Sequence, residues 1–210
     1  MIVCVLRSGG EYKPCHVQWL ARQVPGLVAI TDVNVPGVRC IPMLHLWPGW
    51  WAKMNLFAPC LSGGLLYLDL DTVVVGGVEA FRDQQRTTLL GDFYWPEKLA
   101  SGFMYLTEKD RRKVWSEWVK APAQHMRDFK QGGDGAFIAS VLPNTAMWQD
   151  THPGAVVSYK VHVCRRGSSK RAVGSGIIPT GARVVCFHGK PRPWDVSDSW
   201  VPPLENVDGA

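Results

Sequence analysis

Two carboxylates form the most chemically distinctive feature of the sequence. Asp69 and Asp71 are separated by one residue, and apolar runs at 65–68 and 72–75 lie on either side of them. Side chains two positions apart in a strand point to the same face, so both carboxylates can converge where the strand ends. Two adjacent anions repel each other unless a cation or a proton lies between them. The pattern predicts a metal or phosphate site, and the alternative is a turn acid beside a capping acid.

A second group of polar residues follows the last apolar run, 183–187. His188 comes directly after it, and Gly189, Lys190 and Arg192 follow, interleaved with prolines. A single histidine after a strand is more often structural, but beside two carboxylates it becomes a candidate third ligand. Two carboxylates and one imidazole suit an ion of the Mn²⁺ type. Lys190 and Arg192 could neutralise the phosphates of a ligand bound to that ion.

The N-terminal residues predict the elements that must position these groups. Residues 1–6 have the pattern of a buried strand, 14–24 of a helix begun by Pro14, and 27–32 of a second strand that ends in an acid. Strand, helix and strand in this order form a βαβ unit, which implies a parallel sheet. The polar, glycine-bearing turn at 7–12 lies where α/β folds bind phosphate.

The remaining pattern predicts several shorter elements. Strands are expected at 39–41, 73–75, 87–90, 101–106 and 183–187, helices at 50–57, 108–120 and 134–139, and an extended segment at 156–163. In the helix at 108–120, Val114, Trp115, Trp118 and Val119 are expected to face inward, and Arg111, Arg112, Lys113 and Glu117 outward. Asp134 could cap its helix. The tryptophans of 47–51 could stack on sugars, but their apolar neighbours favour a place in the core.

Length and composition indicate one globular domain. The chain has 210 residues, of which 46% are hydrophobic and 20% charged. We expect a domain at 1–200 and a frayed tail at 201–210. No apolar run is long enough for a membrane span, and the N-terminus lacks a basic leader. Six scattered cysteines without a Cys-x-x-Cys pair indicate reduced thiols, and we expect a cytoplasmic protein.

The charge is modest. A net charge of +5 favours anionic ligands but is too small and dispersed to indicate binding of duplex nucleic acid. Residues 165–171 form a basic loop, R-R-G-S-S-K-R. Such a loop is either a solvated surface segment or a lid or acceptor contact near an anionic ligand.

Several stretches together resemble GT-A type glycosyltransferases. The run 65–75, L-L-Y-L-D-L-D-T-V-V-V, is similar to their Asp-x-Asp strand, and most similar to that of the glycogenin and lipopolysaccharide galactosyltransferase group with its small phage and bacterial relatives. Residues 1–12 resemble the first strand and turn of that group. Residues 101–104 resemble its Asn-Ala-Gly-(Val/Met) strand, 133–136 its Asp-Gln-(Asp) segment, and 187–194 its terminal His-x-x-Gly-x-x-Lys-Pro-Trp motif.

The resemblance implies a fold, a reaction and a metal. It implies a single α/β domain of the Rossmann-like GT-A type, with a mixed, mostly parallel sheet flanked by helices. It further implies transfer of a sugar from a nucleotide-diphosphate donor, a UDP-sugar, to an unknown acceptor with retention of configuration. Mn²⁺ (or Mg²⁺) would be held by Asp69, Asp71 and His188.

The resemblance also implies roles for individual residues. The diphosphate would be contacted by Gly189 and by Lys190, or by Arg192 because the final motif is compressed. Asp134 would contact the donor sugar. The remaining donor-binding residues would be Leu6, Arg7, Ser8, Tyr12, Leu70 and Ser101.

Two other functions fit parts of the sequence. Asp69 also suits the nucleophile of a haloacid-dehalogenase-like phosphatase, but that fold expects the pair near the N-terminus and a later Gly-Asp-x-x-x-Asp. Here Gly133-Asp134 leads to Ile138, with no second acid. A non-catalytic nucleotide- or carbohydrate-binding module is the other alternative, because Ser101 replaces the usual Asn and Gly135 the usual Gln.

Overall fold

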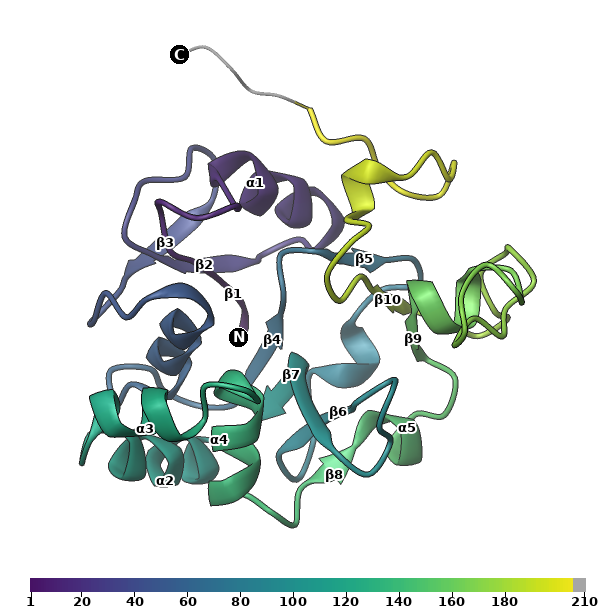
Figure 1. Cartoon of the computed structure of the whole chain (residues 1–210). Helices are drawn as coiled ribbons and strands as arrows, with labels where there is room; N and C mark the ends of the chain where they lie inside the picture. Colours follow the sequence, from purple (N-terminus) through teal and green to yellow (C-terminus); the bar gives the residue numbers. More distant parts are fainter. Residues whose placement is uncertain (206–210) are drawn as a thin grey trace.

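The structure is a computed structural model that describes residues 1–205 and contains two β-sheets with helices packed around them (Figure 1). The larger sheet has the strand order β3-β2-β1-β4-β7-β6-β8. Its strands are β1 (Ile2–Leu6), β2 (Val28–Thr31), β3 (Arg39–Pro42), β4 (Leu65–Leu68), β6 (Thr88–Gly91), β7 (Leu99–Leu106) and β8 (Ala146–Met147). Strands β3, β2, β1 and β4 are mutually parallel, and β7 runs antiparallel to both β4 and β6. The expected mixed, mostly parallel α/β sheet is thus confirmed.

Helices cover the larger sheet. They are α1 (Pro14–Gln23), α2 (Glu108–Trp118), α3 (Pro122–Asp128), α4 (Gly133–Val141) and α5 (Trp148–Thr151). Three 3₁₀ helices span Gly49–Phe57, Glu79–Phe81 and Pro193–Asp195, and a π-helical turn spans Tyr159–Val163. In residues 1–205, every helix is too short or too polar to span a bilayer. The predicted βαβ unit is present as β1, α1 and β2.

The chain leaves the larger sheet after Leu68, through a short turn that contains the carboxylate pair. β5 (Thr72–Val74) joins a second sheet of order β5-β10-β9, together with β9 (Val156–Ser158) and β10 (Val184–Cys186). β10 is antiparallel to β5 and parallel to β9. The two acids therefore occupy the crossing from one sheet to the other, and β10 carries His188 to the same region.

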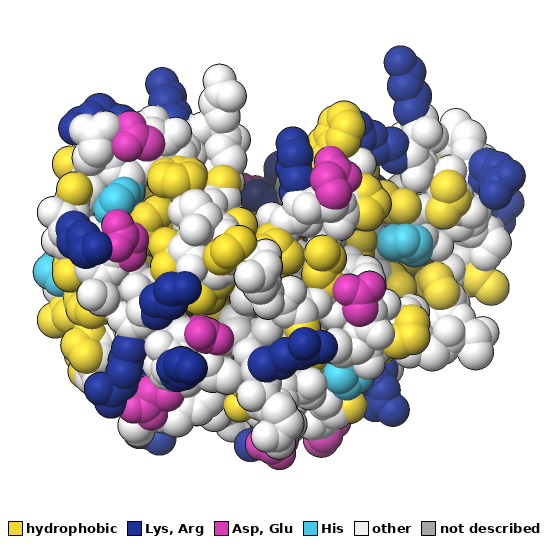
Figure 2. Space-filling model, turned by 90° about the horizontal axis from the view of Figure 1, so that it is seen from below, with side chains coloured by type: hydrophobic (Ala, Val, Ile, Leu, Met, Phe, Trp, Pro, Cys, Tyr) yellow, Lys and Arg dark blue, Asp and Glu magenta, His cyan; other side chains and the backbone are white. Residues whose placement is uncertain are grey.

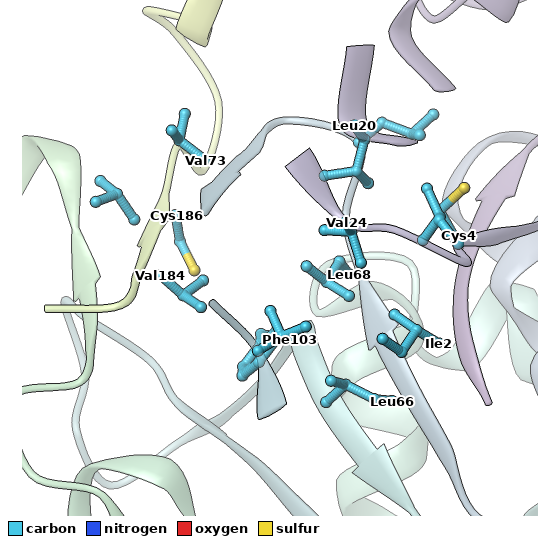
Figure 3. Packing of buried hydrophobic residues seen from close by; sticks show 14 of the residues in the cluster. Ile2, Cys4, Leu20, Val24, Leu66, Leu68, Val73, Phe103, Val184 and Cys186 are labelled. Atoms are coloured by element: carbon cyan, nitrogen blue, oxygen red, sulfur yellow. The ribbon is translucent and has the colours of Figure 1, made fainter. Parts of the chain in front are cut away.

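The hydrophobic core lies on both faces of the larger sheet, as strand alternation requires. On one face, Ile2 and Cys4 of β1 pack with α1 and with Val184 and Cys186 of the second sheet (Figure 3). On the other face, Val3 and its neighbours pack with the 3₁₀ helix Gly49–Phe57, α2 and α4. The carboxyl ends of β1 and β4 are thereby held between two packed layers.

The segment expected to be an α-helix at 50–57 is instead the 3₁₀ helix Gly49–Phe57. Its tryptophans divide between core and surface. Trp51 is buried, whereas Trp50 is 53% exposed. The expectation of a core role therefore holds for Trp51 and is wrong for Trp50, because adjacent side chains of a helix point in different directions and that of Trp51 packs in the core.

Helix α2 departs from the expected amphipathic pattern at two positions. Arg111 is 1% exposed, although it was expected to face outward, and Val119 is 45% exposed, although it was expected to face inward. The Arg111 guanidinium donates to the carbonyls of Leu61 and Gly63 at 2.9 and 2.8 Å. Those hydrogen bonds compensate the buried charge of Arg111. The helical pattern of the sequence, taken alone, would place this side chain in solvent.

Two further expectations are corrected by the structure. Only Val156–Ser158 of the segment 156–163 is extended, and the rest forms the π-helical turn. Residues 201–205, expected to be frayed, contact α1, where Trp19 Nε1 donates to the Pro202 carbonyl at 2.8 Å. The rest of the predicted tail, 206–210, lies outside the described residues.

Candidate active site

A pocket of about 780 Å³ lies at the carboxyl ends of β1 and β4. Five segments line it: the turn after β1, the start of the 3₁₀ helix Gly49–Phe57, the carboxylate pair, residues 131–134 before and within α4, and residues 188–192 after β10. Parallel strands present their carboxyl ends at one edge of a sheet, which is where open α/β sheets bind ligands. Segments far apart in the sequence thus meet at the position that the sequence predicted.

The two carboxylates enter this pocket with different degrees of burial. The Asp69 side chain is 30% exposed, and the Asp71 side chain is 9% exposed. Burial, followed by repulsion from Asp69, raises the pKa of Asp71 to about 7. A Cβ atom at Gly102 on the antiparallel β7 would lie 3.2 Å from Asp69 Oδ2. Glycine at position 102 therefore leaves space for the Asp69 carboxylate.

Lys53 neutralises the first of these acids. Its ammonium lies 2.9 Å from Asp69 Oδ1 and 3.5 Å from Asp134 Oδ2, and its side chain is 14% exposed. Burial acts to lower the pKa of Lys53, but the charges of Asp134 and Asp69 outweigh burial and raise it. The ammonium also lies over the Tyr67 ring, whose hydroxyl donates to Asp69. Lys53 is thus a fixed cation inside the pocket.

Arg192 neutralises the second acid. Its guanidinium forms an ion pair with Asp71 and a bidentate one with Glu11, with Nε–Oε1 and Nη2–Oε2 distances of 3.1 and 2.7 Å. It also lies over the Tyr12 ring, 5.1 Å from the centroid. Lys190, the other candidate phosphate contact, does not line the pocket, and its 68% exposed side chain pairs with Glu11 and Asp195. Of the two candidate phosphate contacts, Arg192 is the one that lines the pocket.

The turn after β1 lines the pocket with Leu6, Arg7, Ser8 and Tyr12, as predicted. Asp32, at the end of β2, holds this turn in place. The Ser8 amide and hydroxyl donate to its carboxylate at 2.8 and 2.6 Å, and Arg7 forms an ion pair with it. Leu70 and Gly189 also line the pocket. Apart from Ser101 and Lys190, the residues predicted to bind the donor therefore line one pocket.

Ser101 and Asp134 lie next to each other beside Lys53. The Ser101 hydroxyl donates to Asp134 Oδ2 at 2.6 Å, and both side chains are buried. Asp134 lies within the first turn of α4, whose capping position is Gly132. The expected capping role of Asp134 is therefore wrong, because its carboxylate is directed to Ser101 and Lys53 instead. Asp134 lines the pocket, whereas Ser101 does not.

His188 lines the same pocket but is not gathered with the two acids. Its Nε2 lies 2.6 Å from the Ser158 hydroxyl, and its ring stacks on Phe93 at 5.4 Å. Burial, followed by the nearby charge of Lys160, lowers the pKa of His188 to about 4. In residues 1–205, no group of three His, Cys, Asp or Glu side chains is placed to hold one ion. The expected three-ligand arrangement is therefore not formed in this structure.

The two acids by themselves fit a hard divalent cation. Carboxylate oxygens are the ligands such ions prefer. Burial, followed by repulsion from Asp69, raises the pKa of Asp71 even though Arg192 lies beside it. The oxygens of a ligand's phosphates could supply further donors. A cation at this position would have to displace or share Arg192.

Two pocket residues, Lys53 and Glu11, have roles in the structure that were not predicted from the sequence. Lys53 carried a usable signal, because it is the single charge in the apolar run 50–57 and a charge in such a run needs a partner. Glu11 carried none, because its partner Arg192 comes from a distant part of the chain.

The arrangement of strands and helices is similar to that of solved glycosyltransferases of the GT-A fold. No protein-family profile and no curated protein sequence matches the chain. Among solved structures, galactosyltransferase LgtC in complex with donor and acceptor sugar analogs has a TM-score of 0.54 and 14% identity, covering 92% of this chain and 88% of that one. An active-site mutant of LgtC gives a TM-score of 0.57 at 13% identity, covering 92% and 89%.

The glycosyltransferase GlyE of Streptococcus pneumoniae has a TM-score of 0.62 at 10% identity, with 92% of this chain and 56% of that chain covered. At such identities the likeness shows the fold, and the expected GT-A fold is confirmed.

Proposed function

We propose that this protein is a glycosyltransferase that moves a sugar from a nucleotide-diphosphate donor, a UDP-sugar, to an acceptor. One observation carries the proposal. Asp69 and Asp71 line a single pocket with Arg192 and with the turn after β1, on a sheet of the GT-A fold. The solved LgtC structure of this fold holds donor and acceptor sugar analogs. The pocket thus combines a place for a nucleotide with paired acids and a cation for its phosphates.

In the proposed reaction, the bond between the anomeric carbon and the diphosphate oxygen breaks, and that carbon forms a bond to an acceptor oxygen. The diphosphate departs with the electron pair of the broken bond, and one of its oxygens takes the proton that the acceptor hydroxyl loses. Arg192 would stabilise the charge that develops on the leaving phosphates. Lys53 would hold Asp69 and Asp134 in place beside the donor sugar. We propose retention of configuration on the basis of the sequence resemblance.

We further propose that Mn²⁺ or Mg²⁺ takes part. Asp69 and Asp71 would hold the ion together with phosphate oxygens of the donor, and the ion would supply Lewis-acid stabilisation of the leaving diphosphate. His188 as a third ligand stays a prediction, and binding through Nε2 would require the contact with Ser158 to be given up.

The test is a thermal-shift screen of nucleoside diphosphates with and without Mn²⁺, followed by donor hydrolysis. UDP with Mn²⁺ should raise the melting temperature more than either alone. Asp71→Asn should abolish that joint effect and lower donor turnover by about 100-fold or more. Folding should survive, because the substitution removes a buried charge whose pKa is raised to about 7.

The matched control is Asp83→Asn, which removes an exposed acid that does not line the pocket and should leave both measurements unchanged. No stabilisation by any nucleotide, or full activity of the Asp71 variant in metal-free buffer, would contradict the proposal.

A further inference from the structure

A second group of side chains adjoins the pocket and has no part in the reaction described above. One half of it is the aromatic loop after β6, Phe93, Tyr94 and Trp95. The other half is the basic loop, 165–171, after the π-helical turn, with four Arg or Lys among seven residues. We name these two loops together the aromatic–basic surface. Basic side chains project on the right-hand side of the molecule in Figure 2, the side that carries residues 159–176 in Figure 1.

The two loops are joined by cation–π contacts. The Arg171 guanidinium lies 4.2 Å from the ring centroid of Tyr94 and 4.8 Å from that of Trp95. Lys98 approaches Trp95 at 5.3 Å, and Trp95 is 50% exposed. Stacking uses the flat face of a guanidinium and leaves its in-plane N–H donors available for an anion.

The positive charge of the basic loop is not neutralised. Arg165, Arg166, Lys170 and Arg171 are all exposed, and within residues 1–205 none of them forms an ion pair, in contrast to Lys53 and Arg192 in the pocket. The nearby acid Asp92 accepts the backbone N–H groups of Tyr94 and Trp95 at 2.7 and 2.9 Å. Four unpaired cations in seven residues attract an anionic ligand.

The basic loop is held in position by its own backbone. The Arg166 amide donates to the Gly174 carbonyl at 2.9 Å, and the Val173 amide donates to the Val161 carbonyl at 2.8 Å. A Cβ atom at Gly174 would lie 2.2 Å from the His162 carbonyl oxygen, so only glycine allows this close approach. The loop that carries these cations is therefore held in place by backbone hydrogen bonds.

The aromatic–basic surface meets the pocket at His188. The Tyr94 ring lies 5.0 Å from the His188 ring, and His188 and Gly189 line the pocket. On the same side, the Lys160 ammonium would lie 3.5 Å from a Cβ atom at Gly189. A ligand on the surface could thus extend one end into the space where the donor sugar is proposed to react.

We propose that the aromatic–basic surface binds the acceptor, and that the acceptor is a saccharide carrying phosphate or carboxylate groups. This inference rests on the proposed function. Arg and Lys bind such anions through charge-assisted hydrogen bonds, and the partly exposed ring of Trp95 offers an apolar face for a sugar. Single-stranded nucleic acid fits less well, because base stacking on Tyr94 and Trp95 would have to displace Arg171.

The first test compares probes that differ in charge alone. Hexagalacturonate and its fully methyl-esterified form share one backbone, and maltohexaose with its monophosphate provides the phosphate arm. Calorimetry on the whole chain should show each anionic probe binding about tenfold or more tightly than its neutral partner. The affinity should fall as salt is added. The probe pair in which the anionic form gains more affinity over its neutral partner shows whether the acceptor carries carboxylate or phosphate groups.

The second test removes the cations. A variant with R165Q, R166Q, K170Q and R171Q should lose about tenfold or more in affinity for the anionic probe. The control removes the same number of exposed charges from α2, α3 and the segment that follows, with K109Q, K113Q, R127Q and K130Q, and should bind as the unchanged protein does. Stabilisation by UDP with Mn²⁺ should be the same in both variants.

Failure of this inference and failure of the proposed function are distinguishable. Absence of any nucleotide effect would overturn the proposed function, on which the acceptor role depends. Equal affinity for charged and neutral probes, unchanged affinity in the loop variant, or tighter binding of oligothymidylate than of either saccharide would overturn the inference and leave nucleotide binding intact.

Discussion

Lys53 shows how one side chain can organise a site. Its ammonium lies between Asp69 and Asp134 and receives little compensation from solvent, because the side chain is only 14% exposed. It holds two acids that would otherwise repel each other. Their relative position is therefore set before any ligand arrives, which is the condition for a preorganised site.

Replacing Lys53 by Met should lower the free energy of unfolding by about 3 kcal/mol, because two acids would be left near each other without their cation. Lys53→Arg, which keeps the charge, should recover most of that loss. Urea unfolding at neutral pH measures both. Equal losses in the two variants would mean that shape, not charge, determines the effect.

His162 gives a pH dependence whose sign can be worked out. Its Nδ1 accepts the Ser158 N–H at 2.9 Å, and burial lowers the pKa of His162. The folded state therefore keeps this histidine neutral at a pH where the unfolded chain, with a pKa of about 6.5, takes up a proton. Because the unfolded state binds more protons, stability should fall as the pH drops below about 6.5.

His162→Asn keeps an acceptor but removes the titration. Urea unfolding at about pH 7.5 and about pH 5.5 should show a smaller stability difference for this variant than for the unchanged protein. An equal difference would assign the acid sensitivity to other groups.

At the scale of elements, α2 stabilises the segment that delivers β4. Arg111 donates to four carbonyls, those of Leu61 and Gly63 at short distance and those of Leu56 and Ala58 at 3.5 Å. A guanidinium can span several acceptors because its donors form a planar fork. The loop between the 3₁₀ helix and β4 therefore depends on a residue of a later helix.

Arg111→Lys should lower the free energy of unfolding by about 2 kcal/mol, because an ammonium cannot reach all four carbonyls and leaves buried acceptors unpaired. The matched control is Arg112→Lys, an exposed position on the same helix, which should change stability by less than about 0.5 kcal/mol. Chemical denaturation compares the two. Equal losses of stability in the two variants would show that the burial of Arg111 is not the cause of its effect.

At the scale of the whole molecule, the C-terminal segment closes against the first helix. The Trp194 ring lies 4.2 Å from that of His16 and 5.7 Å from that of Trp19. Arg192, two residues earlier, reaches Asp71, 121 positions away in the sequence. The last segment thus connects α1 to the candidate active site.

Trp194→Ala should cost about 2 kcal/mol of stability, because the ring is partly buried against α1. It should also reduce stabilisation by UDP with Mn²⁺, because Arg192 loses its anchor. Thermal shifts measure both quantities. Trp200→Ala is the control: it should lower stability without reducing the nucleotide effect, since Trp200 packs on Tyr159 and Phe187 instead.

Much of this architecture is predictable from local pattern. The βαβ unit, the strand before Asp69 and the polar turn after β1 follow from apolar runs and turn residues, because a strand or helix face is set by residues close in sequence. The burial of Arg111 and the change of sheet at β5 are not predictable in this way. They depend on carbonyls and strands supplied by distant segments.

The same division applies to the paired acids. The sequence alone determined that Asp69 and Asp71 follow a buried strand of an α/β sheet, since an apolar run is a local property. Strand alternation does not place their side chains, because both acids lie in the turn between β4 and β5. Tertiary structure decided what each acid meets there: Lys53 for Asp69, Arg192 for Asp71, and Ser158 in place of a shared ion for His188. Charges that compensate one another are brought together by packing of elements far apart in the chain, and no local spacing encodes that contact.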